Sequence, residues 1–402
     1  MANKVLITGI GAVSAIGLNI QELKDSILLS RSGIGYYDRL DSTLSRKLPS
    51  AQISLSDEQI KSKIKGLKKK ITYSRTSLLA MLAATEAISV AGLTRQECSG
   101  AALVSSSSSG GMDKGEVFYK DFISNTKKPN LKFALTHDCG DATEKIAELL
   151  GIDAYITTIS TACSSAANAL IHASRLIKSG MVDIVIAGGS DALCRFTVNG
   201  FNSLMILSDQ PCKPFDRDRT GLNLGEAAGY FVLESEASVL RRGIKPLAEL
   251  SGYGNACDAY HQTASSPNGE GAYLAMNQAI KSSGYKPEDI DYINAHGTGT
   301  LNNDLSESIA LKRIFNEEVP PLSSTKSFTG HTLAAAGGIE AVLAVLSIQN
   351  GWVYPNLNFS NKIEETGLVP VTQLLSNKKV NHILSNSFGF GGNNSSLLIS
   401  AC

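Results

Sequence analysis

The stretch that decides the fold runs from Thr157 to Ala173 and reads TTISTACSSAANALIHA. The residues that lead into it, 154–159, are typical of a short buried strand. From about Cys163 onward, small and apolar residues recur at helical spacing, which predicts a helix that ends near Gly180. A strand followed at once by a helix is a basic unit of α/β folds, and it places Cys163 at the junction.

This junction is a place where a cysteine becomes reactive. In the first turn of a helix the backbone N–H groups lack partners and favour an anion, so we expect the pKa of the Cys163 thiol to be lowered. The neighbouring Ala162, Ser164 and Ser165 are small and leave room for a substrate. A buried structural cysteine is an equally good interpretation of this stretch alone.

Length and composition restrict the class of protein. The chain has 402 residues, of which 43% are hydrophobic and 18% charged, so it is globular and long enough for two large cores or one duplicated core. Lys and Arg total 37, as do Asp and Glu, which argues against bulk nucleic-acid binding. We find no apolar run of the ~18 residues that a membrane span needs, and the N-terminal stretch resembles a first strand more than a signal peptide.

The seven cysteines are far apart in the sequence and form no C-x-x-C pair. This spacing fits neither a disulfide framework nor a zinc site, so we expect a cytoplasmic protein without a metal or cofactor.

Strand and helix patterns alternate along the chain, and the alternation occurs twice. Strands are expected at 5–8, 101–104, 183–189, 225–234, 247–252, 290–295, 321–325, 382–387 and 395–400. Helices are expected at 76–91, 237–242, 270–283, 304–315 and 331–349. This α/β pattern predicts two related halves, 1–245 and 246–402, each with a parallel-type sheet, and a ligand cleft at their junction. Residues 115–140 favour no assignment.

Three further stretches have competing interpretations. Gly9-x-Gly11 resembles the start of a dinucleotide fingerprint, but Ser14 stands where the third glycine belongs, so a tight turn is favoured. The serine run 105–109 is either a linker or a loop that lines a cavity. Six lysines in residues 61–70 form either a solvated face or a docking patch for an acidic partner.

Two of the six histidines lie in glycine-containing loops after predicted strands. His296 is in Asn294-Ala295-His296-Gly297-Thr298-Gly299-Thr300, and His331 ends Lys326-Ser327-Phe328-Thr329-Gly330-His331. Functional groups collect at such strand ends in α/β sheets, so both are candidate site residues.

An acidic pair, Asp304 and Glu307, lies one helical turn apart. The pair is either a surface feature or a support for the site, in which Lys326 pairs with Glu307.

Taken together, the motifs resemble those of elongating beta-ketoacyl-[acyl-carrier-protein] synthases, condensing enzymes of the thiolase fold. The resemblance rests on the two histidine motifs above, on Thr161-Ala162-Cys163-Ser164-Ser165 and on Asn386-Ser387-Phe388-Gly389-Phe390-Gly391-Gly392, which follow the family's order across nearly the whole chain. It implies a thiolase-like fold with a mixed five-stranded sheet in each half, layered α-β-α-β-α. It also implies acyl carrier protein as partner and a homodimer or a heterodimer with a related ketosynthase.

The resemblance implies a role for each site residue. Cys163 would carry the acyl chain, His296 and His331 would stabilise the enolate formed when malonyl loses carbon dioxide, and Lys326 would complete the catalytic set. The remaining implied roles are an oxyanion hole from the backbone of Cys163 and Phe390, phosphopantetheine binding by Thr298 and Thr300, support from Asp304 and Glu307, an acyl pocket and gate formed by Ser109, Phe201, Phe388 and Phe390, and carrier docking by Lys63, Lys65, Lys68 and Lys69.

Departures from the usual family pattern point away from a housekeeping enzyme. Asn393 follows the Gly391-Gly392 pair where threonine is usual, Ala166 follows the two serines after Cys163 where glycine is usual, and Ser109 is small and polar. Synthesis of an aryl polyene or another polyketide is therefore a credible variant of fatty-acid elongation. The alternatives are a non-catalytic chain-length partner, which would lack Cys163, and a thiolase or an initiating synthase, which His331 disfavours.

Overall fold

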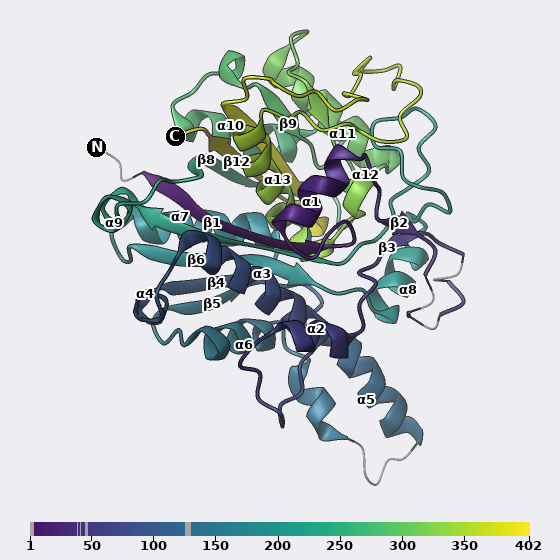
Figure 1. Cartoon of the computed structure of the whole chain (residues 1–402). Coiled ribbons are helices and arrows are strands. Elements are labelled where there is room, and N and C mark those ends of the chain that lie inside the picture. Colours follow the sequence, from purple (N-terminus) through teal and green to yellow (C-terminus); the bar gives the residue numbers. More distant parts are fainter. Residues whose placement is uncertain (1–3, 38, 41, 45–46, 125–129) are drawn as a thin grey trace.

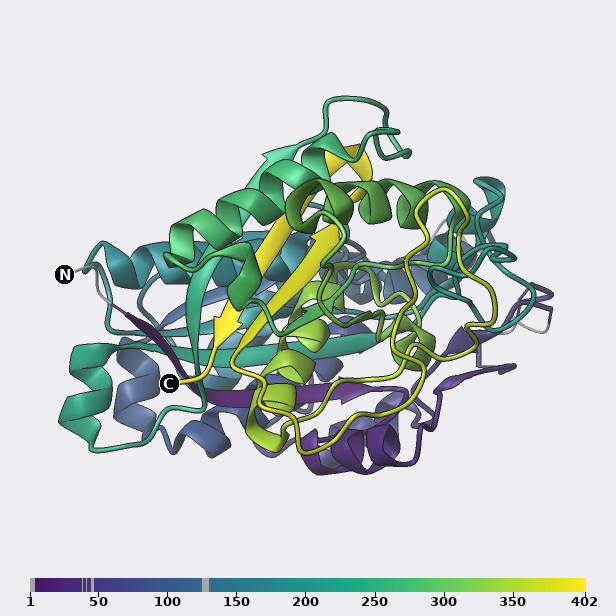
Figure 2. The ribbon, with the colours of Figure 1, turned by 90° about the horizontal axis from the view of Figure 1, so that it is seen from above.

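A computed structural model describes residues 4–37, 39–40, 42–44, 47–124 and 130–402. Its centre is a mixed sheet of ten strands (Figures 1 and 2). In chain order these strands are β1 (Val5–Ser14), β4 (Ala102–Ser106), β5 (Ile156–Ile159), β6 (Ile184–Asp191), β7 (Ala227–Ser235), β8 (Ala248–Cys257), β9 (Tyr292–Asn294), β10 (Leu322–Ser323), β11 (His382–Phe388) and β12 (Asn393–Ser400). A separate small pair consists of β2 (Ile34–Gly35) and β3 (Ser50–Ala51).

The sheet consists of two halves with the same topology. Its order is β10-β9-β11-β12-β8-β1-β7-β6-β4-β5, so each half reads third, second, fourth, fifth and first strand. The parallel and antiparallel pairings also match between the halves. The expected pair of parallel-type sheets is wrong in two respects. Each half contains antiparallel as well as parallel pairs, and the two halves are joined. Leu6 and Ile7 of β1 pair with Glu249 and Ala248 of β8, which joins the halves into one sheet.

Helices complete the five layers that the family resemblance implies. The middle layer contains α7 (Ser165–Lys178) and α13 (Ala336–Asn350), which contact each other and both halves of the sheet. The outer face of the first half is covered by α3 (Arg75–Ala91) and α6 (Gly140–Leu150), and that of the second half by α10 (Glu270–Ser283) and α11 (Leu301–Phe315) (Figure 1). Buried apolar side chains fill each interface, with one cluster between the halves and one beneath each outer layer.

The other helices are short or peripheral. They are α1 (Ile20–Leu28), α2 (Asp57–Lys63), α4 (Arg95–Gly100), α5 (Met112–Ser124), α8 (Arg195–Ser203), α9 (Glu236–Arg242) and α12 (Lys326–Thr329), together with the 3-10 turns η1 (Leu131–Thr136), η2 (Pro287–Asp289), η3 (Leu333–Ala335) and η4 (Phe390–Gly392).

Local signals explain the helix limits that the sequence predicted well. Ser74 accepts a hydrogen bond from the Ser77 N–H at 3.1 Å and caps α3, which ends at Gly92 with φ of 64°. The helix expected at 270–283 is confirmed without a shift. The helix expected at 331–349 is wrong at its start, because Leu333 has φ of 55° and α13 begins only at Ala336.

The expectation that no apolar run reaches the length of a membrane span is wrong by length and composition, because within the described residues one stretch meets both criteria. It spans Leu333–Asn350, and 83% of it is buried inside the structure. Its apolar composition matches its position in the middle layer, where α13 contacts α7 and both halves of the sheet.

Candidate active site

Cys163 lies in a tight turn between β5 and α7. Ala162 adopts φ of 53°, which is uncommon for a residue with a side chain, and three hydrogen bonds hold it there. The Ser165 N–H and hydroxyl both donate to the Ala162 carbonyl, at 3.1 and 2.6 Å, and the Thr161 N–H donates to the Ser165 hydroxyl at 2.8 Å. The turn therefore fixes the Cys163 backbone before the helix begins.

Two expectations about Cys163 are wrong. The residue precedes α7, whose N-cap is Ser164, so it is not in the first helical turn. Burial raises the pKa of the thiol to about 11, although the Phe390 N–H and the charge of Lys326 oppose the rise. With a side chain only 4% exposed, desolvation outweighs the backbone dipoles, so the resting group is a thiol.

His331 is the side chain that contacts this thiol. Its Nε2 lies 3.1 Å from the Cys163 sulfur, and the loop that carries it precedes η3 and α13. Burial, with a smaller effect of Lys326, lowers the pKa of His331 well below its ordinary value. The imidazole is therefore neutral near pH 7, and its Nε2 can accept the thiol proton when the sulfur attacks a substrate.

His296 completes a pair of imidazoles. The two rings are perpendicular with centroids 5.4 Å apart, and His296 Nδ1 lies 3.2 Å from the Lys326 ammonium nitrogen. Burial is the main cause that lowers the pKa of His296 well below its ordinary value, and Lys326 adds to it. Two neutral imidazoles beside a buried cation form a site suited to developing negative charge.

The expected pair between Lys326 and Glu307 is wrong. The Lys326 ammonium group instead pairs with Glu340 of α13, and both side chains are 1% exposed. Sequence reasoning missed Glu340. The available signal was a single acidic residue in the apolar run 336–346, where an unpaired charge would be costly.

Glu307 and Asp304 stabilise the His296 loop by accepting hydrogen bonds from its backbone N–H groups. Glu307 accepts hydrogen bonds from the His296 and Gly297 N–H groups at 2.9 and 2.8 Å, and Asp304 accepts one from Thr298 at 2.9 Å. Both carboxyl groups are buried, so the interpretation as a surface pair is wrong. Burial raises the pKa of Glu307 to about 7.

A pocket of about 290 Å³ opens above this set of residues. Thr298 and Thr300 line it, and their hydroxyl oxygens are 2.9 Å apart. The residues with predicted roles that the pocket brings together are Cys163, His296, Thr298, Thr300, His331, Phe388 and Phe390. It is also lined by Asp258 and His261 of the loop after β8, which the sequence analysis did not single out.

The other predicted acyl-pocket residues lie outside this pocket. Phe201 of α8 stacks on Phe390 with ring centroids 5.6 Å apart. Ser109 is bound to a residue that the sequence analysis missed, since its N–H and hydroxyl donate to Asp191 at 3.0 and 2.8 Å. Asp191 also accepts hydrogen bonds from the Ser107 and Ser108 hydroxyl groups and from the Ala334 N–H. The serine run therefore supplies hydrogen-bond donors to a buried carboxylate, and its interpretation as a linker is wrong.

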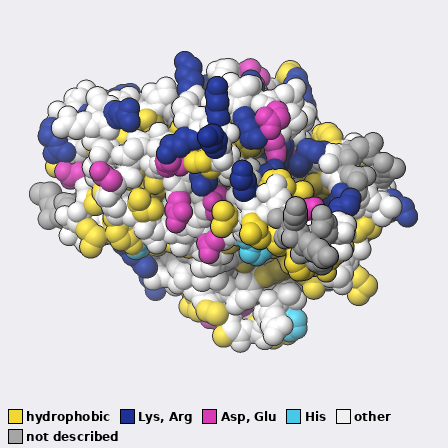
Figure 3. Space-filling model, turned by 90° about the horizontal axis from the view of Figure 1, so that it is seen from below, with side chains coloured by type: hydrophobic (Ala, Val, Ile, Leu, Met, Phe, Trp, Pro, Cys, Tyr) yellow, Lys and Arg dark blue, Asp and Glu magenta, His cyan; other side chains and the backbone are white. Residues whose placement is uncertain are grey.

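The predicted docking lysines are exposed. Lys63, Lys65 and Lys69 have no ion-pair partner among the described residues, whereas Lys68 pairs with Glu148. Figure 3 views the molecule from below, where many Lys and Arg side chains lie across the upper part of the face, among acidic and apolar side chains. The lysines of α2 and the loop after it are therefore available to an acidic surface.

Comparison with known proteins agrees with the motifs. The family model "Beta-ketoacyl synthase, N-terminal domain" matches residues 2–238, and "Beta-ketoacyl synthase, C-terminal domain" matches 247–360. A curated 3-oxoacyl-[acyl-carrier-protein] synthase 2 from Staphylococcus aureus (strain COL) is 33% identical over 411 residues, which cover 98% of this chain and 97% of the relative.

Two solved structures are similar over the full length of both chains. "The ishigamide ketosynthase/chain length factor" has a TM-score of 0.94 at 30% identity. A structure of a type II PKS acyl-carrier protein in complex with its ketosynthase bound to the hexaketide has a TM-score of 0.88 at 27% identity.

Proposed function

This chain belongs to the beta-ketoacyl synthase family, and from that premise we propose the chemistry of its site. It is an acyltransferase that condenses a malonyl unit on acyl carrier protein with an acyl chain held on Cys163. Carbon dioxide is released, and the chain becomes two carbons longer. The product belongs to fatty-acid or polyketide synthesis, with an aryl polyene as one polyketide variant.

The first step is acyl transfer. The Cys163 sulfur attacks the carbonyl carbon of an acyl thioester, and the His331 Nε2 accepts the thiol proton. The oxyanion receives hydrogen bonds from the backbone N–H groups of Cys163 and Phe390, the two that already donate toward the sulfur. The carrier thiolate then leaves, takes the proton from His331, and the acyl group remains on Cys163.

The second step forms the new carbon–carbon bond. Malonyl thioester enters along Thr298 and Thr300, with its carbonyl oxygen between the two imidazoles. Loss of carbon dioxide leaves an enolate, whose charge His296 and His331 stabilise. For this step each neutral imidazole carries its proton on the ring nitrogen that faces the pocket, so His331 first changes tautomer. The enolate carbon attacks the acyl-Cys163 carbonyl, the C–S bond breaks, and the Cys163 thiolate takes up one proton from the solvent to restore the thiol.

The observation that carries this proposal is the convergence of three residues on one pocket. Cys163 follows a strand of the first half, and His296 and His331 follow strands of the second half. Each donor aimed at a developing oxyanion contributes ~3–4 kcal/mol, so two imidazoles give a large share of the barrier reduction.

The structures similar to this chain include a chain length factor, which makes a non-catalytic partner subunit the alternative function. Cys163 favours the catalytic role, because a partner without chemistry has no use for a thiol 3.1 Å from an imidazole.

The partners are a carrier protein and a second chain. A similar ketosynthase was solved in complex with its acyl-carrier protein. The exposed lysines of residues 63–69 fit an acidic carrier. The second chain, identical or a related ketosynthase, has a ready edge at β5, the last strand of the sheet. There Tyr155 and Ile156 are 38% and 39% exposed.

We further propose a cytoplasmic location and two ketosynthase halves, 1–245 and 246–402. The seven cysteines are all free, which fits a reducing compartment. The two family models meet near residue 245, between α9 and β8.

The test combines the purified chain with acyl-loaded and malonyl-loaded carrier protein. Mass spectrometry should detect an acyl adduct on the Cys163 peptide and a carrier product two carbons longer. An inactive chain that makes a related ketosynthase active would instead establish the partner role. Malonyl consumption without acyl-Cys163 would exclude condensation by the proposed route.

A further inference from the structure

A buried ion pair lies next to residues 223–225, the backbone segment that is hydrogen-bonded to His331. Arg75, at the start of α3, is 1% exposed, and Glu226, directly before β7, is fully buried. The guanidinium donates to both carboxylate oxygens of Glu226, from Nε at 3.0 Å and from Nη2 at 2.8 Å. This two-point contact fixes the relative position of the two side chains.

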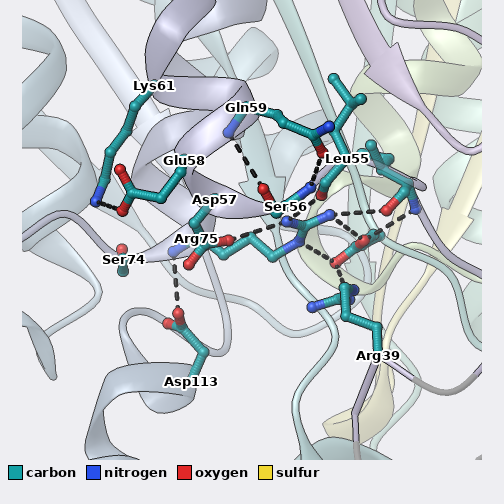
Figure 4. A network of polar contacts seen from close by, with 12 residues as sticks. Arg39, Leu55, Ser56, Asp57, Glu58, Gln59, Lys61, Ser74, Arg75 and Asp113 are labelled. Atoms are coloured by element: carbon teal, nitrogen blue, oxygen red, sulfur yellow. Dashed lines mark hydrogen bonds and ion pairs between the residues drawn. The ribbon is translucent and has the colours of Figure 1, made fainter.

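The remaining donors of Arg75 bind the segment that leads into α2. Nη2 donates to the Ile53 carbonyl at 3.0 Å, and Nη1 donates to the Leu55 carbonyl at 2.9 Å and to Asp57 at 3.0 Å (Figure 4). All five N–H groups of the guanidinium therefore have a partner, a pattern that lysine with three donors cannot reproduce.

The carboxylate of Glu226 also accepts several hydrogen bonds. Besides Arg75, its carboxylate accepts from Arg39 at 2.8 Å, from the Ile53 N–H at 3.0 Å and from the Leu193 N–H at 3.1 Å. Leu193 lies just before α8, the helix that carries Phe201. One carboxylate thus connects α3 with three further segments of the first half.

The segment just before Glu226 is the one that holds the catalytic loop. The His331 N–H donates to the Asn223 carbonyl at 2.7 Å, and the Gly225 N–H donates to the His331 carbonyl at 2.9 Å. Gly225 is flanked closely by this loop, because a Cβ at that position would lie 2.1 Å from the Thr329 carbonyl oxygen. Any shift of Glu226 is therefore transmitted through one peptide unit to the His331 backbone.

We propose that Arg75 and Glu226 are positioning residues for condensation, which hold His331 at the distance from Cys163 that the chemistry requires. This inference rests on the proposed function for the role of His331. Arg75 also binds the residues at the start of α2. The same guanidinium therefore helps to fix the position of the docking lysines, in α2 and the loop after it, relative to the active site.

A second Arg–Glu pair, at the other ends of α3 and β7, provides a matched control. Arg242 pairs with Glu234, which is fully buried near the end of β7, and donates to the Ala91 carbonyl at the end of α3. Glu234 lies eight positions after Glu226, about 26 Å along an extended strand. Both pairs join α3 to β7, but only the Arg75 pair adjoins His331.

The experiment compares Glu226→Gln and Arg75→Lys with Glu234→Gln and Arg242→Lys. Three quantities are measured on folded protein: thermal stability, kcat and KM of condensation, and the pH dependence of Cys163 alkylation by iodoacetamide, read by mass spectrometry of the Cys163 peptide. All four variants should lose stability. Only the Glu226 and Arg75 variants should lose kcat, by roughly ten- to a hundredfold, with KM for the acyl substrate nearly unchanged.

The pH dependence of Cys163 alkylation separates a positioning role from a purely structural one. A mutation that only lowers stability leaves this pH dependence unchanged. His331, Lys326 and Asp191 all act on the Cys163 thiol, so a displaced His331 changes the pH at which the sulfur reacts. The profile should move in the Glu226 and Arg75 variants and stay at the wild-type position in the controls. Equal behaviour of the two pairs would overturn the proposal.

A third variant covers the case in which Glu226→Gln and Arg75→Lys do not fold. Arg39→Gln removes one contact to Glu226 from a side chain that is 27% exposed, so it should fold and produce a smaller change in the same direction. An unchanged profile and kcat in Arg39→Gln would count against the proposal. If wild-type protein did not condense at all, the proposed function would fail, while the alkylation comparison would still decide the positioning role.

Discussion

Each half of the sheet has a third strand that leads through a turn into a helix of the middle layer. The two turns differ in length and in the side chains they carry. In the first half β5 leads through residues 160–164 into α7. In the second half β10 leads through residues 324–335 into α13. The short turn presents Cys163 among small residues, whereas the long one carries a buried cation, Lys326, and the His331 imidazole.

The comparison shows that neither half of the duplicated fold contains a complete set of catalytic residues. The nucleophile comes from one half and its proton acceptor from the other, and the 3.1 Å contact between them exists only where α7 and α13 lie side by side. The first predictions below each disable one of the two turns, and the last tests a surface outside both.

The largest effect is expected from removal of the sulfur in the short turn. Cys163→Ala should lower kcat of condensation by at least about 10⁴-fold, because no other group can carry the acyl chain. Release of carbon dioxide from malonyl carrier should persist, since the imidazoles remain. Cys98→Ala is the matched control, because Cys98 is also 4% exposed but lies outside the pocket. Normal elongation by Cys163→Ala would refute the nucleophile assignment.

The next largest effect concerns the second half. His296→Ala and His331→Ala should each lower carbon dioxide release by about 10²–10³-fold, because each removes one donor to the enolate oxygen. Only His331→Ala should also change the alkylation rate of Cys163. His382→Ala, which loses contacts with Ser400 and Tyr285 away from the pocket, is the control. Undiminished carbon dioxide release would contradict the shared role of the rings.

A smaller effect is expected in the pH dependence of stability. A histidine whose pKa is lowered by folding binds fewer protons in the folded state, so its stabilising contribution is complete above its unfolded pKa of about 6.5 and is lost as pH falls below it. Each such histidine should contribute a loss of about 1.4 kcal/mol per pH unit until its folded pKa is reached. Glu307, whose pKa is raised to about 7, contributes with the opposite sign over this range, so the comparison between variant and wild type carries the test.

Urea unfolding between pH 7 and 5 measures this slope. His331→Gln stays neutral, so it should lose less stability than wild type over that range. Parallel curves for His331→Gln and wild type would show that His331 is not held neutral by burial.

The smallest effect is expected at the docking lysines. Lys65→Glu with Lys69→Glu should raise the apparent KM for carrier protein several-fold at low salt and leave kcat nearly unchanged, because exposed charges mainly affect encounter. Lys378→Glu with Lys379→Glu, also exposed, is the control for net charge. An effect of equal size in both double variants would return the lysine run to the interpretation of a solvated face.

Local patterns predicted most of the fold. The helix at 270–283 follows from periodicity, and the division into two related halves with a five-stranded sheet each follows from the family resemblance. Residues 115–140 favoured no assignment, yet they contain the end of α5 and all of η1. No residue of α5 is buried, and its apolar side chains Val117, Tyr119, Phe122 and Ile123 are exposed, so packing against a core does not define this helix.

The candidate site was predicted in part. The loops of Cys163, His296 and His331 were recognised from their glycines and small residues, and the structure brings all three to one pocket. Glu340 and Asp191 were missed, because an isolated acidic residue in the sequence does not reveal which buried donors surround it.

The sequence by itself determined which residues are chemically competent and in what order strands and helices follow, because turn geometry, capping and periodicity are properties of neighbours in the chain. Only the tertiary structure decided that Lys326 pairs with Glu340, that the thiol pKa of Cys163 rises, and that β1 joins β8. Those outcomes depend on burial and on contacts between residues far apart in the chain, and packing alone sets which distant groups meet and how much water they lose.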